Sequence, residues 1–191
     1  MVFSIILDTR TENYLVFLMC GKFAFIWFSK TVTLASNSII VNKGLIAKIN
    51  VSKTLFPMAL VQESLYRQAA VFSLLFAVLL VFGYPVNTVW FWLLPLILVN
   101  YLMIVACALI AASMVCVVRD FTKLVPLAMT FLLFTLGIFW DVHGLDDPQK
   151  TEIVLVLNPL AFILDAYRQV LMYQTSPDAF TFLFLHCYSQ Q

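Results

Sequence analysis

Charged residues are scarce in this chain. Only 11% of its 191 residues are Asp, Glu, Lys or Arg, whereas 63% are hydrophobic. A soluble domain carries about a quarter charged residues, and a chain of this size exposes too much surface to hide so much apolar area in a water-soluble core. The composition therefore excludes an ordinary soluble domain and indicates that the bilayer solvates most of the chain. The formal net charge of +1 gives no reason to expect nucleic acid binding.

Motifs for catalysis and cofactor binding are also lacking. The sequence has no GxxxxGK[ST] pattern, so any ATP chemistry is expected on another polypeptide. Its four cysteines have neither CxxC nor metal-ligand spacing, and no metal or cofactor is expected. A cluster of Asp141, His143, Asp146 and Asp147 would suit a membrane-embedded transferase. Because it holds one histidine in no standard zinc spacing, a solvated loop explains it better.

Long apolar runs dominate the sequence, and they are continuous rather than alternating. The backbone inside lipid must satisfy its own hydrogen bonds, and continuous apolar runs favour helices over a barrel. We therefore predict an all-α integral membrane protein with one transmembrane domain over residues 1–191. Four complete spans are expected between a partial first span and the start of a last one, so both ends look truncated. These segments are 1–7, 14–34, 57–82, 89–118, 121–140 and 179–186.

The short loops between these spans differ in charge. The loop over residues 36–56 carries three lysines and no acid, and a second corner holds Arg119, Asp120 and Lys123. Cytoplasmic loops carry an excess of lysine and arginine, so both are predicted inside. The uncharged turn at 83–88 and the acidic segment after the fourth span are predicted outside. This is the topology of a multi-pass protein of the cell inner membrane.

Residues 153–173 are apolar but interrupted. Asn158-Pro159 breaks the helical pattern, and Asp165 and Arg168 would be buried charges in a spanning helix. We therefore expect short helices that lie at the outer face or dip into it as re-entrant segments.

Lys22 falls near the middle of the first complete span. A charge at bilayer depth is normally paired, snorkelled or facing a water-filled path. Snorkelling and a role in a pathway both remain open, and Phe23 and Trp27 are the neighbouring aromatic residues for such a path. The tryptophans at 90, 92 and 140 fit the aromatic belt of a membrane interface by position.

The inner loop contains one short amphipathic segment. Residues 44–49 place apolar side chains on a helical period, with Leu45, Ile46 and Ile49 able to form one small face. Such a helix serves either as a surface anchor at the headgroups or as a docking element for a cytoplasmic partner.

Several short motifs follow one another in a recognisable order. They are Gly21 and Trp27, Asn42-Lys43-Gly44-Leu45-Ile46 with Phe56-Pro57, Leu94-Pro95-Leu96, Arg119-Asp120, and Leu157-Asn158-Pro159-Leu160 with Ala166-Tyr167-Arg168. With its order of spans, the chain resembles the membrane subunit of type-2 ABC exporters, in particular those that export polysaccharides such as O-antigen, capsule or teichoic acid. An exporter of drugs or lipids from the same class is the alternative.

The resemblance implies a mechanism. Two copies would form a channel, two cytoplasmic ATP-binding subunits would dock on the inner loops, and their ATP-driven closure would move a lipid-linked glycan outward. Coupling to the ATPase would then fall to Asn42, Lys43, Leu45, Ile46, Lys48 and Ile49. The outer gate segment would contain Asn158, Pro159, Tyr167 and Arg168.

Overall fold

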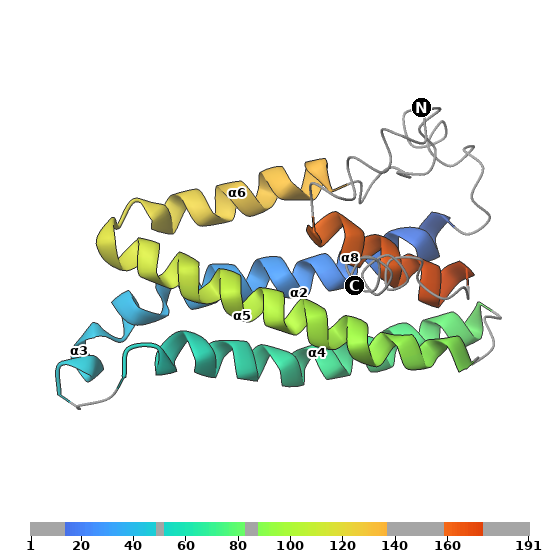
Figure 1. The fold of residues 1–191 in the computed structure, drawn as a ribbon, viewed down its shortest axis with the longest axis horizontal. Coiled ribbons are helices and arrows are strands. Elements are labelled where there is room, and N and C mark those ends of the chain that lie inside the picture. The colour runs from blue at the N-terminus through green and yellow to red at the C-terminus, as the bar shows by residue number, and fades with distance from the viewer. Residues whose placement is uncertain (1–13, 49–51, 83–87, 137–158, 174–191) are drawn as a thin grey trace, which may run out of the picture.

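The computed structural model describes residues 14–48, 52–82, 88–136 and 159–173 (Figure 1). Every regular element in these ranges is helical and none is a strand, which confirms the predicted all-α fold. In chain order the elements are α2 (Tyr14–Val41), α3 (Lys43–Ile46), α4 (Leu55–Val81), the 3-10 helix η1 (Thr88–Trp92), α5 (Leu93–Val117), α6 (Phe121–Thr135), α8 (Pro159–Arg168) and the π-helix η3 (Gln169–Tyr173).

Three described helical segments are long and apolar enough to cross a membrane: Leu18–Val41, Leu55–Val81 and Thr88–Val117. The next helix, α6, is apolar but has only 15 residues. At 1.5 Å per residue this is about 22 Å, short of the roughly 30 Å of bilayer hydrocarbon. The predicted partial span at 1–7, the end of the span at 121–140 and the last segment at 179–186 lie outside the described residues.

The first complete helix is longer than the sequence predicted. It continues through the polar stretch after Leu34 as far as Val41. Two serines there bond back to the preceding turn: Ser36 Oγ donates to the Thr33 carbonyl at 2.8 Å, and Ser38 Oγ to the Ala35 carbonyl at 2.7 Å. Because these hydroxyls are satisfied within the helix itself, the polar residues do not end it.

At the centre of the bundle lies α2, which packs against α4, α5, α6 and α8. Figure 1 shows that α2 and α5 end, and α4 and α6 begin, at the end of the bundle that carries α3. The short helix α8 lies beside the other, N-terminal half of α2 (Figure 1). Helices that follow one another along the chain are therefore antiparallel, whereas α2 and α5, which pack closely, run parallel.

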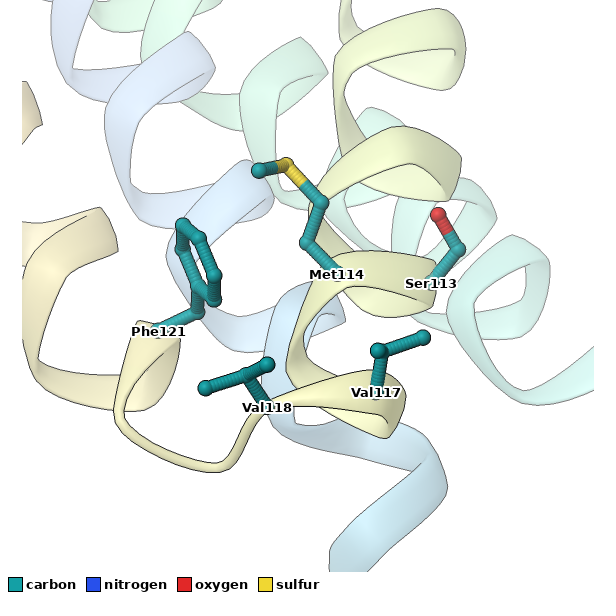
Figure 2. A pocket seen from close by; sticks show the side chains of 5 residues that line it. All are labelled: Ser113, Met114, Val117, Val118 and Phe121. Carbon is teal, nitrogen blue, oxygen red and sulfur yellow. The ribbon is translucent and has the colours of Figure 1, made fainter.

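A tight corner joins α5 to α6. Val118 adopts an extended conformation after its N–H donates to the Met114 carbonyl at 2.9 Å, and Arg119 and Asp120 then form the turn. An apolar cavity of about 280 Å³ lies at this corner, lined by three residues from the end of α5, by Val118 and by Phe121 from the start of α6 (Figure 2). The two helices thus meet at a charged turn with an apolar inner side.

Candidate functional site

One end of the bundle is strongly basic. The cations of the turns at this end are all exposed: Lys43, Lys48, Lys53, Arg119 and Lys123. Asp120 is the one acidic side chain among the described residues of these turns. The two regions that the sequence placed together on the cytoplasmic side, the inner loop and the second corner, therefore occur at the same end of the molecule (Figure 1).

The inner loop contains the short helix α3, joined tightly to α2. Asn42 links the two, since its Nδ2 donates to the Ser38 carbonyl at 2.8 Å while its own carbonyl accepts from the N–H groups of Leu45 and Ile46, each at 3.0 Å. Leu45 is 49% exposed, whereas Ile46 is half-buried. The two residues therefore point in different directions, and Ile49 lies outside the described residues. Their role in coupling stays a prediction.

A polar stripe runs along the exposed side of α2. Lys22 and Lys30 are exposed, and Ser29, Thr33 and Asn37 are partly exposed at helical spacings of three, four or seven residues. No acidic residue occurs in α2. The opposite side of the helix is buried against its neighbours and carries Cys20, Ala24, Phe25, Trp27, Phe28, Thr31, Val32 and Ala35. This helix thus presents hydroxyls, an amide and two ammonium groups away from the subunit core.

The structure separates the three residues that the sequence associated with a path. Lys22 belongs to the polar stripe, while Phe23 is partly buried against the core. Trp27 is only 4% exposed; its Nε1 donates to Ser64 Oγ at 3.2 Å and its ring meets Phe72 edge-on at 6.4 Å. Trp27 thus faces α4 within the same subunit. Whether these residues line a path stays a prediction.

The predicted outer segment is more deeply buried than expected. Arg168 is 2% exposed and Asp165 is 6% exposed, although the sequence argument treated their charge as a reason against burial. That reason was wrong, because α2 offers room at Gly21, where a Cβ atom would come within 2.8 Å of Arg168 Nη2. The described helical segment is still short of a crossing, since the 10 residues of α8 and the 5 of η3, which continues it, span at most about 22 Å. Pro159 is exposed at its start, and Asn158 lies outside the described residues.

Aromatic rings connect three of the helices. The Tyr167 ring of α8 stacks on Phe72 of α4 with centroids 5.9 Å apart, and Phe72 in turn contacts Trp27 of α2. Phe76 continues the row and stacks on Trp90 at 5.1 Å. The sequence analysis missed Phe72 and Phe76, although their i,i+4 spacing was a usable sign. Trp90, assigned by position to an interface belt, therefore also packs against α4.

Polar atoms are buried beside these rings. The Tyr167 hydroxyl lies next to the Asn100 side chain. Neither this hydroxyl nor Asn100 Oδ1 has a partner at hydrogen-bond distance and angle among the described residues, and the same holds for Gln68 Nε2. Within the described ranges no three His, Cys, Asp or Glu side chains come together as metal ligands. The acidic cluster around His143 lies outside those ranges.

Similarity to known proteins agrees with this architecture. The family model described as "ABC-2 type transporter" matches residues 2–172. The chain is 23% identical over 172 residues to an O-antigen export system permease protein RfbA of Klebsiella pneumoniae, covering 90% of this chain and 66% of the relative. A protein of the same name from Myxococcus xanthus is 22% identical over 183 residues, covering 94% of this chain and 69% of the relative.

The chain thus spans just under two thirds of the length of the Klebsiella relative. The family match extends from the residues before α2 through α8, so it includes the bundle, the basic end and the polar stripe. The helices that are long and apolar enough to cross a bilayer agree with that match. This protein is a membrane protein that belongs to the ABC-2 type transporter family.

Proposed function

We propose that this chain is the membrane subunit of an ATP-driven exporter that moves lipid-linked polysaccharide outward across the cell inner membrane. Its family supports a transport role, and relatives named O-antigen export permeases support a polysaccharide. The single observation that carries the proposal is the polar stripe of α2 (Lys22, Ser29, Lys30, Thr33 and Asn37), which lies on the exposed side of a helix long and apolar enough to span.

The stripe needs a polar environment at membrane depth. Ionisable residues in spanning helices almost always face other helices or a water-filled cavity rather than lipid. Among the described residues no helix covers the stripe, and a second copy of the chain is the proposed cover, with water and substrate between the two copies. Hydroxyl and amide groups exchange hydrogen bonds with water and with sugar hydroxyls alike, and the two ammonium groups attract phosphates of a lipid carrier.

The exposed side of α6 gives further support for assembly. Leu124, Leu127, Phe131 and Phe134 are between 48% and 73% exposed and line a shallow apolar groove. This groove offers an apolar contact surface to lipid or to the second copy. Such an apolar surface is stable only out of water. This agrees with a chain that crosses the bilayer several times.

ATP chemistry is assigned to a separate ATP-binding subunit, because this sequence carries no phosphate-binding loop. The proposed docking surface is the basic end, with α3 and the corner at Arg119 as its two parts. Movement of α3 would pass directly into α2, since Asn42 bonds to both helices. The helix that α3 would move, α2, is thus the helix that carries the polar stripe.

Reconstitution tests this proposal. Proteoliposomes that contain the chain and its ATP-binding subunit are loaded with fluorescent lipid-linked polysaccharide, and exposure of the glycan to an added glycosidase is followed with and without ATP. The variant Lys22→Gln/Lys30→Gln is expected to slow export while it still binds the ATP-binding subunit. The control Glu63→Gln/Arg67→Gln removes an exposed ion pair of α4 and is expected to export normally.

Two outcomes would contradict the proposal. ATP-dependent movement of a drug or a phospholipid, with no movement of the glycan, would place the protein among the other exporters of its class. Equal loss of export in the stripe variant and in the α4 control would remove the stripe from the path.

A further inference from the structure

A second cavity, distinct from the α5–α6 corner pocket, lies at the basic end of the bundle. It has a volume of about 400 Å³ and lies between the ends of α2 and α5 and the short helix α3. Three cations from three different segments line it, namely Lys43, Lys53 and Arg119. Among its described lining residues none is acidic. The cavity is therefore electropositive and has no counter-charge of its own.

The rest of the wall is apolar. Ile39 and Ile40 come from the last turns of α2, and Ile46 comes from α3. An amphiphile with an anionic head and a hydrocarbon chain matches this division, because the cations hold the head and the isoleucines contact the chain. The ends of α2 and α5 that meet here are C-termini, whose carbonyls oppose an anion. The attraction therefore comes from the three side chains.

The position of the cavity selects the kind of anion. Ile39 and Ile40 belong to a candidate span that ends at Val41, and Cys116 belongs to one that ends at Val117. The cavity thus lies where two apolar helices reach their polar ends, which is the level of lipid headgroups. A lysine- or arginine-lined pocket at this level is the kind of site that binds anionic headgroups.

We propose that this cavity binds the phosphate headgroup of an anionic phospholipid of the bilayer, with one acyl chain along Ile39 and Ile40. The bound lipid joins α2, α3 and α5, and it holds α3 with Leu45 outward. This site does not depend on which molecule the exporter moves.

Cys116 provides a direct reporter, because it lines the cavity and is exposed. A variant that keeps only this cysteine carries Cys20→Ala, Cys107→Ala and Cys187→Ala. The full chain is placed in nanodiscs of phosphatidylcholine alone or with added phosphatidylglycerol, and the rate of labelling by uncharged N-ethylmaleimide is measured. Phosphatidylglycerol is expected to slow labelling severalfold. A second reporter, Ser113→Cys with Cys116→Ser, lines the corner pocket (Figure 2) and is expected to label at the same rate in both lipids.

Matched charge variants test whether the cations of the cavity cause the slower labelling of Cys116. Lys43→Gln/Arg119→Gln removes two cations of the cavity, and Lys48→Gln/Lys123→Gln removes two exposed cations of the same end that do not line it. Protection of Cys116 is expected to disappear in the first pair and persist in the second. Ile39→Trp fills the cavity without changing charge, and it is expected to abolish the lipid-dependent difference as well.

Three results would overturn the site. In the first, Cys116 labels equally fast in both lipids, so no lipid binds there. In the second, both charge pairs lose protection alike, which would attribute the protection to the general surface potential of the membrane. In the third, protection appears only when the ATP-binding subunit is added, which would make the cavity a protein contact.

Discussion

Arg168 of α8 packs against the backbone of Gly21 in α2. A Cβ atom added to Gly21 would lie 2.8 Å from Nη2, 3.2 Å from Nε and 3.3 Å from Cζ of this guanidinium group. Both residues belong to short motifs that the sequence placed at opposite ends of the chain, and the fold brings them into contact. Glycine leaves this space to the buried guanidinium group, whereas a side chain at position 21 would require that group to shift.

Gly21→Ala is expected to lower the thermal stability of the purified protein. Alanine is the better helix former by about 1 kcal/mol, but overpacking against a buried group costs about 1–3 kcal/mol. Arg168 is 2% exposed and has little room to move away. Gly44→Ala is the matched control, since nothing lies within 4 Å of its added Cβ, and it is expected to be neutral or slightly stabilising. Equal melting temperatures for the two variants would show that the Arg168 guanidinium group moves away from position 21 at little cost in stability.

Tyr167 is expected to tolerate loss of its hydroxyl but not of its ring. The hydroxyl has no hydrogen-bond partner in the described part of the chain, so Tyr167→Phe removes no bond of that kind there. Tyr167→Ala removes the ring that stacks on Phe72 and leaves a cavity, which typically costs about 3–5 kcal/mol. Denaturation in detergent measures both changes. A large loss of stability in Tyr167→Phe would mean that the hydroxyl is bonded in the folded protein.

Leu45→Asp is expected to abolish association with the ATP-binding subunit while the chain still inserts and folds. The sequence alone predicted that Leu45 and Ile46 act together, but the structure leaves Leu45 49% exposed and directs Ile46 into the basic cavity. A charge forced into an apolar contact costs several kcal/mol. Co-purification measures the association. Val118→Asp alters the other corner of the basic end. If Val118→Asp lost the ATP-binding subunit while Leu45→Asp still bound it, the docking surface would lie at that corner.

Thr88→Cys and Lys48→Cys are expected to label from opposite sides of the membrane. Thr88 begins the helical segment that ends at Val117, and Lys48 lies at the basic end with the lysine and arginine excess. The positive-inside rule places the basic end in the cytoplasm. A membrane-impermeant maleimide added to intact cells should therefore mark position 88 and leave position 48 unlabelled, with labelling after permeabilisation as the control. The reverse pattern would invert the topology.

Sequence alone determined which solvent surrounds this protein and which local structure follows. So few charges in so many apolar residues require a bilayer, and a bilayer requires helices. Local sequence preferences also placed helix boundaries: Pro57 falls in the first turn of α4, and the Arg119-Asp120 corner separates α5 from α6. These features depend on backbone hydrogen bonding and on neighbouring residues, which the order of residues specifies directly.

Only the tertiary structure decided which side of each helix faces protein. A helix such as α5 is apolar all round, so its hydropathy does not distinguish lipid contacts from contacts with other helices. The burial of Arg168 against Gly21, the row from Trp27 through Phe72 to Tyr167, and the cavity lined by Lys43 and Arg119 all join segments that are remote in the sequence. In a bilayer these choices follow from close packing and paired polar groups, and both exist only when the helices are in place.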